Sequence, residues 1–160
     1  ELDGSAWANT IHQHLGGRPP QVDLGREMEL ASLLRGASLE SLIGSAHDLS
    51  DGGLAQALAE SVIRFGVGAR VWLDDIISRD GVDATNALFS ESTSRVLVSV
   101  PREDDVKFLG LCEARNYPVL RIGVTDGTGT DAALEVQGQF TVSVAEIRER
   151  SAATLPKYFG

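Results

Sequence analysis

The octet Ala46-His47-Asp48-Leu49-Ser50-Asp51-Gly52-Gly53 is the stretch of sequence that best indicates the fold of this chain. Apolar residues follow it at the three- and four-residue spacing of a buried helix face, and they are Leu54, Ala55, Leu58, Ala59 and Val62. We therefore predict a strand over residues 45–49, a Gly-containing turn, and a helix over residues 53–64. Ser50 or Asp51 is predicted to cap the amino terminus of this helix.

Gly52 and Gly53 carry no side chains that would keep a ligand away from the first backbone N–H groups of this helix. Such a helix end attracts phosphate or carboxylate groups. Asp48 and Asp51 are themselves anionic, so a phosphate here requires a divalent cation such as Mg²⁺, which accepts carboxylate and phosphate oxygens together. The octet thus predicts a site for phosphate and metal. The alternative is an ordinary capped helix after a tight turn.

A second polar cluster, Phe89-Ser90-Glu91-Ser92-Thr93-Ser94-Arg95, stands just ahead of a strand predicted over residues 96–100. Polar side chains at a strand entrance favour a ligand site. The alternative is a solvated loop in which Glu91 and Arg95 form an ion pair, which stabilises little when exposed. Together the two clusters suggest one crevice lined by a helix amino terminus and a carboxylate-bearing loop.

Ahead of the octet we predict three helical segments: residues 1–17, a helix from its cap Asp23 to Gly36, and a short helix near residues 39–43. Behind it the sequence predicts further elements. They are a strand at 69–73, helices at 83–88 and 103–115, a strand at 117–124, a turn at 126–130, a hairpin of 132–136 with 139–144, a helix at 145–150 and an apolar tail at 155–160 that docks on the body or on a partner.

Composition excludes several classes of function. The formal charge of −9 argues against a nucleic-acid binder, which concentrates Lys and Arg on one face. No apolar run approaches the roughly 20 residues of a membrane span. The single Cys112 cannot form an internal disulfide and is predicted to be a small core residue, which fits a cytoplasmic protein. The chain opens on Glu1 without an initiator Met, so we expect part of a longer protein.

The two clusters also carry a family resemblance. The segment His47-Asp48-Leu49-Ser50-Asp51-Gly52-Gly53-Leu54 precedes Leu88-Phe89-Ser90-Glu91-Ser92-Thr93-Ser94-Arg95 by about forty residues. In their order and their amino-acid sequence, the two motifs resemble those of the carboxyl-terminal domain of the aminoimidazole ribonucleotide synthetase superfamily. The resemblance covers most of residues 20 to 145, and it is strongest to the last domain in the large subunit of the amidine-forming ligase of purine biosynthesis.

The resemblance implies an α+β fold, with a mixed sheet of roughly four to six strands covered by helices. Residues 1–19 resemble the tail of a preceding ATP-binding domain, residues 20–150 the carboxyl-terminal domain, and 151–160 a carboxyl-terminal tail. The implied reaction uses ATP and Mg²⁺ to convert formylglycinamide ribonucleotide and glutamine-derived ammonia to the amidine. The implied partners are the rest of the large subunit, a glutaminase subunit and a small subunit. This segment alone is expected to be inactive.

By the same resemblance, two groups of residues face the ligands. Asp48 and Asp51 are expected to bind metal, with His47 as an orienting residue. The residues expected to contact nucleotide or phosphate are Ser50, Gly52, Gly53, Ser90, Glu91 and Ser92. No residue is assigned to catalysis.

Two positions depart from the family pattern: Thr93 stands where the substrate-binding copy has Gln, and Ser90 where Gly is common. They favour an auxiliary nucleotide site over direct substrate contact. The alternatives are another superfamily enzyme, such as aminoimidazole ribonucleotide synthetase, selenophosphate synthetase or a hydrogenase-maturation dehydratase, or a non-catalytic assembly domain.

Overall fold

The computed structural model describes residues 1–159, and it describes their side chains except at positions 154, 155 and 158. Contacts divide the chain into two compact units. Unit 1 comprises Glu1–Ala57 and Leu88–Leu120, and unit 2 comprises Leu58–Ala87 and Arg121–Gly160. Each unit is built from segments that are distant in the sequence, so we describe each by itself.

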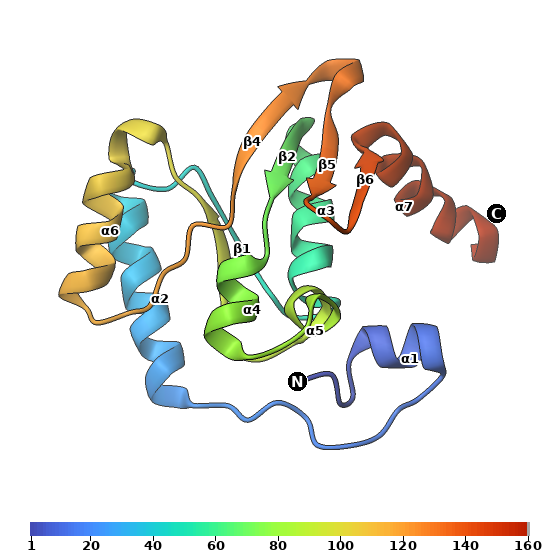
Figure 1. Ribbon diagram of the computed structural model, residues 1–160, viewed down its shortest axis with the longest axis horizontal. Coiled ribbons are helices and arrows are strands. Elements are labelled where there is room, and N and C mark those ends of the chain that lie inside the picture. Colours follow the sequence, from blue (N-terminus) through green and yellow to red (C-terminus); the bar gives the residue numbers. More distant parts are fainter. Residues whose placement is uncertain (160) are drawn as a thin grey trace. The chain divides into compact units, whose positions relative to one another are not determined.

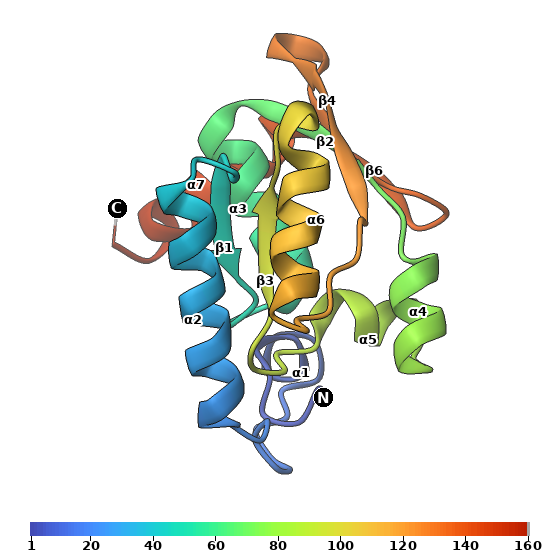
Figure 2. The ribbon, with the colours of Figure 1, turned by 90° about the vertical axis from the view of Figure 1, so that its left-hand side faces the viewer.

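In unit 1, helices α2 (Leu24–Leu39) and α6 (Asp105–Ala114) pack against the strand pair β1 (Ser45–Asp48) and β3 (Val96–Ser99) (Figure 2). Its other elements are α1 (Ala6–His12), the 3-10 helix η1 (Arg102–Asp104) and the start of α3 (Gly53–Phe65). Strand β1 runs antiparallel to β3, with Ser45 opposite Ser99 and Asp48 opposite Val96. The strand predicted at the octet is confirmed, and its end delivers His47 and Asp48.

The core of unit 1 lies between α2, α6 and the strand pair. Its buried residues are Leu30, Leu33, Ala37, Leu42, Phe108, Cys112 and Tyr117, with Val96 and Val98 packed against them. Cys112 is 1% exposed, and burial raises the pKa of its thiol. The prediction that Cys112 is a core residue is confirmed.

Unit 2 contains a four-stranded mixed sheet in the order β4-β2-β5-β6 (Figure 1). Its strands are β2 (Val67–Val71), β4 (Gly123–Thr128), β5 (Ala133–Val136) and β6 (Phe140–Ser143). Strand β2 is parallel to β5, whereas the β2–β4 and β5–β6 pairs are antiparallel. The remaining elements are α4 (Asp74–Asp80), α5 (Ala84–Phe89), the 3-10 helix η2 (Gly129–Asp131) and α7 (Val144–Phe159).

The predicted α+β class, with a mixed sheet of about four strands and accompanying helices, is confirmed. The hairpin around Gly138 is confirmed as β5 and β6. In the part of the chain that the structure describes, no helix is long and apolar enough to cross a membrane.

Four elements differ from the prediction by more than two residues at a boundary. Helix α1 is shorter than residues 1–17, because the Ser5 side chain caps it at one end and Gln13 ends it in a left-handed conformation. Helix α2 continues past Gly36 to Leu39. The prediction of a separate short helix near residues 39–43 is wrong, because residues 40–43 are not helical. Ala37 is fully buried in the core, and this packing outweighs the helix-breaking tendency of Gly36.

The other two differences lie in unit 2. The strand predicted at 117–124 begins instead at Gly123 and runs through the predicted turn to Thr128, because pairing with β2 fixes its register. The predicted helix 145–150 continues as α7 to Phe159 and includes Pro156, so the described part of the predicted tail is helical. Gly160, the last residue of that tail, lies outside the described residues.

Leu33 tests the core of unit 1. It is 3% exposed, whereas Leu39 on the same helix is 76% exposed. We expect Leu33→Ala to lower the free energy of unfolding by about 2–5 kcal/mol, because it removes buried methyl groups and leaves a cavity. Leu39→Ala is the matched control and should change it by less than about 0.5 kcal/mol. Urea unfolding measures both, and equal effects would contradict the assigned core face of α2.

Candidate functional site

Helix α3 begins directly after the glycine pair. The carbonyl oxygen of Gly52 accepts from the backbone N–H of Gln56 at 3.4 Å, which makes Gly52 the capping residue. The predicted caps, Ser50 and Asp51, are therefore wrong. Ser50 is used otherwise: its carbonyl oxygen accepts from Gly53 N–H at 2.9 Å, and its hydroxyl donates to the Asp48 carboxylate.

Gly53 brings the two polar clusters together. Its φ is +61°, and a Cβ atom placed on it would lie 2.6 Å from the carbonyl oxygen of Ser90 and 2.9 Å from that of Leu88. No side chain fits at such distances, so only glycine permits this approach of two backbones. The two clusters therefore lie in direct contact, whereas the crevice predicted between them stays a prediction. At Gly53 the missing side chain admits the chain's own backbone.

Glu91 takes the first amide at this end of α3. Its Oε1 accepts from the N–H of Gly52 at 2.7 Å and from the N–H of Ala6 at 2.8 Å. Ala6 is the first residue of α1. One carboxylate oxygen therefore serves the amino-terminal ends of two helices, where negative charge is favourable.

Arg95, at the end of the second motif, and Glu27 and Tyr117, outside both motifs, hold the loop that carries Glu91. The Arg95 guanidinium donates to the carbonyl oxygen of Ser90 at 2.6 Å and lies 3.3 Å from its hydroxyl. Ser94, which has a left-handed φ of 57°, donates its N–H and hydroxyl to Oε1 of Glu27 at 2.7 and 2.8 Å. The Tyr117 hydroxyl donates to the carbonyl oxygen of Ser94 at 2.7 Å. Sequence reasoning missed Glu27 and Tyr117, because neither stands near a motif.

Asp48 presents an ionised carboxylate to solvent. Its side chain is 73% exposed. The hydrogen bond from the Ser50 hydroxyl lowers the pKa of Asp48 below its usual value, with further contributions from the Asp48 backbone N–H and from His47. Nδ1 of His47 lies 3.6 Å from Oδ1 of Asp48 and 2.7 Å from its carbonyl oxygen. His47 therefore contacts the neighbouring Asp48, and its orienting role stays a prediction.

A metal at this place would need ligands from outside the chain. Among residues 1–159, no group of three or more His, Cys, Asp and Glu side chains gathers as a metal site. Asp51 is exposed and stands beside the turn. Two exposed carboxylates such as Asp48 and Asp51 suit Mg²⁺ only where phosphate oxygens and water take the remaining coordination positions, which is the usual form of a protein magnesium site.

Two backbone amides remain open at the start of α3. Within the described part of the chain, the N–H groups of Leu54 and Ala55 donate to no protein acceptor. The first turn of a helix leaves such donors for caps, water or anions. These two N–H groups follow the turn in which the Ser50 hydroxyl donates to the Asp48 carboxylate.

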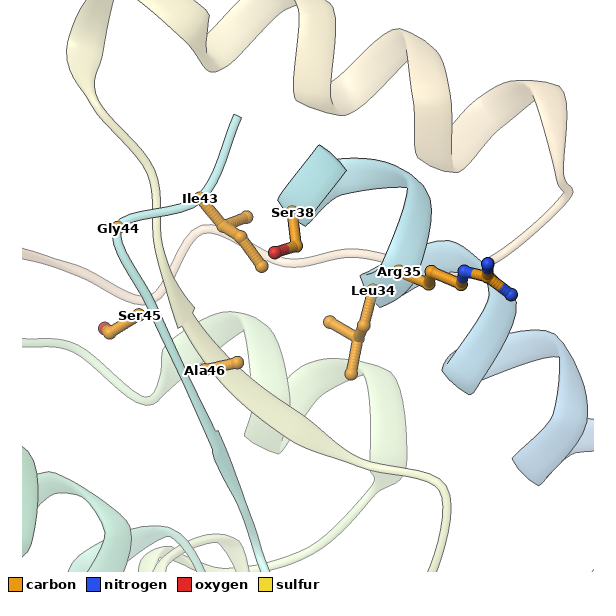
Figure 3. A pocket seen from close by; sticks show the side chains of 7 residues that line it. All are labelled: Leu34, Arg35, Ser38, Ile43, Gly44, Ser45 and Ala46. Atoms are coloured by element: carbon orange, nitrogen blue, oxygen red, sulfur yellow. The ribbon is translucent and has the colours of Figure 1, made fainter. Parts of the chain in front are cut away.

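A hollow of about 380 Å³ lies elsewhere in unit 1, between the end of α2 and the start of β1 (Figure 3). Its lining residues are Leu34, Arg35, Ser38, Ile43, Gly44, Ser45 and Ala46. In Figure 3 the Arg35 guanidinium extends away from Ser45 and Ala46. No residue predicted for the site lines this hollow.

Comparison with known proteins shows the family to which the chain belongs. The family model described as "AIR synthase related protein, C-terminal domain" matches residues 1–134, so the chain belongs to this family. Among particular proteins, it resembles the phosphoribosylformylglycinamidine synthase subunit PurL. The subunit from Leifsonia xyli subsp. xyli is 67% identical over 161 residues, covering 100% of this chain and 21% of that protein. The one from Renibacterium salmoninarum is 58% identical over 160 residues, covering 100% and 20%. The chain spans about a fifth of these relatives.

Solved structures show the same fold. The structure "T. maritima PurL complexed with FGAR" superposes with a TM-score of 0.71 at 20% identity, covering 86% of this chain and 23% of that one. The "Structure of PurLQS from Thermotoga maritima" gives a TM-score of 0.62 at 19% identity, covering 89% and 24%. The superfamily resemblance found in the sequence is confirmed.

Gly53→Ala tests the contact between the clusters. We expect it to lower the free energy of unfolding by at least about 2 kcal/mol, because the methyl group adds a backbone clash to the strain of a positive φ. Gly129→Ala is the matched control: its φ is +68°, but nothing lies within 4 Å of the added methyl group. Thermal unfolding measures both, and equal losses would show that the close approach to residues 88–90 costs nothing.

Ser50→Ala tests the electrostatics of Asp48. In the wild-type chain we expect the pKa of Asp48 below its usual value, and in Ser50→Ala a rise toward that value, because the main hydrogen bond to the carboxylate is lost. The carboxyl chemical shift of Asp48, followed by NMR against pH, measures both. A lowered folded-state pKa stabilises the fold above the unfolded-state pKa, and this contribution is lost as the pH falls through the folded-state value. An unchanged pKa in Ser50→Ala would refute the assigned cause.

Proposed function

We propose that this chain is the carboxyl-terminal part of the large subunit of a phosphoribosylformylglycinamidine synthase. The observation that carries the proposal is the 67% identity, over the whole chain, to a subunit of that name. The reaction we infer is ATP-dependent: formylglycinamide ribonucleotide and glutamine-derived ammonia give the amidine, with release of ADP and phosphate. It belongs to purine biosynthesis, and we place the protein in the cytoplasm.

The domain assignment follows from the same proposal. We assign residues 1–19 to the tail of a preceding ATP-binding domain, 20–150 to the family's carboxyl-terminal domain, and 151–160 to a carboxyl-terminal tail. The partners we infer are the rest of the large subunit, a glutaminase subunit and a small subunit. The name PurLQS of a structurally similar Thermotoga maritima assembly supports an assembly with further subunits.

Within the enzyme, we propose that the start of α3 forms one wall of a nucleotide site. Asp48 and Asp51 would hold Mg²⁺ together with phosphate oxygens and water, and His47 would orient Asp48. The open N–H groups of Leu54 and Ala55 support a phosphate at this wall. Ser50, Gly52 and Gly53 line the same turn, and Ser90, Glu91 and Ser92 stand on the adjoining loop. Structures titled as PurL complexes with ATP and with ADP support the choice of nucleotide.

The wall would act by position and charge. Mg²⁺, when bound, neutralises phosphate charge during phosphoryl transfer. The chain itself supplies ionised carboxylates, held in place by Ser50 and His47, and backbone donors from a fixed helix start. Because Asp48, Asp51 and Glu91 are all anionic, a phosphate without a cation would be repelled here.

A specific observation favours a second function, that of an assembly domain without ligand contacts. Gly53 and Glu91 both make internal contacts that explain their presence without any ligand. On this alternative, Asp48 and Asp51 are ordinary surface carboxylates. Other superfamily enzymes are a further alternative, which the identity to PurL subunits disfavours.

A chimera separates these functions. We would replace the carboxyl-terminal fifth of the Leifsonia xyli subunit by this chain and measure amidine formation with ammonia as nitrogen donor. The proposed function predicts an active chimera, because the replaced part is 67% identical. A folded but inactive chimera would contradict the proposal.

In the active chimera, Asp48→Asn and Asp51→Asn should each weaken Mg·ADP binding by about tenfold or more, because each removes a charge that faces the cation. Asp131→Asn is the control, since Asp131 is exposed and lies in unit 2. Calorimetry measures the affinity. Unchanged affinity and turnover in both variants would favour the assembly domain.

A further inference from the structure

The amino-terminal segment, residues 1–12, is bound to the loop of residues 88–95 at several points. The backbone N–H of Glu91 donates to the carbonyl oxygen of Glu1 at 3.2 Å. The Ala6 N–H donates to Oε1 of Glu91 at 2.8 Å. The rings of Trp7 and Phe89 stack with their centroids 6.0 Å apart. Backbone, carboxylate and ring contacts therefore all join the same two segments.

We propose that Glu91 is a positioning residue that latches segment 1–12 to the start of α3. Its Oε1 is shared between the Ala6 and Gly52 amides, at 2.8 and 2.7 Å. These two amides are far apart in the sequence, and both are donors, so they need a shared acceptor to be connected. The Glu91 carboxylate therefore connects the start of α1 to the start of α3.

A carboxylate suits this place for two physical reasons. Hydrogen bonds from N–H groups to an ionised oxygen are about twice as strong as those between neutral groups. In addition, both donors lie at helix amino termini, where the backbone dipoles favour a negative charge. The loop that presents Glu91 is held by Glu27 from outside the loop and by Arg95 from within it.

The latch makes the position of Gly52 dependent on that of segment 1–12. If the segment moves away, Glu91 loses one of its two donors and the turn of the octet is no longer tied to it. In the proposed enzyme, on whose function this use of the latch rests, the segment belongs to the tail of the preceding domain. Movement of that domain would then reach the candidate nucleotide wall through Glu91.

Amide hydrogen exchange of the 160-residue chain, followed by NMR, tests the latch without reference to activity. In Glu91→Ala we expect the Ala6 and Gly52 amides to exchange about tenfold faster or more, because both lose a hydrogen bond to a charged acceptor. In Glu91→Gln the acceleration should be smaller at both, because the side-chain carbonyl oxygen can still accept. The shared response of two distant amides is the signature of the latch.

Two further variants serve as controls. Glu103→Ala removes an exposed carboxylate and should change neither amide. Glu27→Ala should accelerate the Ser94 amide, to which Glu27 is bonded, more than that of Ala6. The Leu33 amide in the core reports whether each variant stays folded. If Glu91→Gln and Glu91→Ala accelerate only one of the two amides, or neither, the latch is refuted, whereas an inactive chimera would refute the proposed function alone.

Discussion

The close approach of two backbones at Gly53 is the constraint on which the candidate site depends. The carbonyl oxygens of Leu88 and Ser90 lie only 2.9 and 2.6 Å from the position that a Cβ atom would take on any other residue. Because the approach is between backbones, it fixes the start of α3 against the loop of residues 88–95 without help from long side chains. The hydrogen bond from Gly52 to Glu91 then has its geometry set in advance.

This arrangement concentrates negative charge around a helix start. Glu91 accepts from the Gly52 amide, and Asp48 and Asp51 stand at the preceding turn. The Ser50 hydroxyl and, to a smaller extent, His47 lower the pKa of Asp48. A wall of this kind favours a cation that brings its own anionic ligand, which is the physical reason why magnesium and a nucleotide phosphate are proposed together. The chain by itself does not gather enough ligands in its described residues to enclose a metal.

The chain belongs to the family of AIR synthase related carboxyl-terminal domains. The similar PurL subunits are about five times as long as this chain. A segment that contributes one side of a site needs only a few exposed groups in fixed positions, and most of unit 1 serves to fix them. Glu27, Arg95 and Tyr117 hold the loop, and the core between α2 and α6 holds the elements that carry them.

The sequence alone determined the elements with a strong local pattern. Period-3.6 apolar residues predicted α3, β-branched residues predicted β3, and the order of two polar motifs predicted the family. Long-range packing decided the rest. Ala37 in the core carries α2 past Gly36, and pairing with β2 shifts the predicted strand 117–124 to Gly123–Thr128 and into the predicted turn. The roles of Gly53 and Glu91 were likewise decided by tertiary structure, because their contacts join residues 35 or more positions apart, and no local sequence pattern predicts which distant backbone will lie against them.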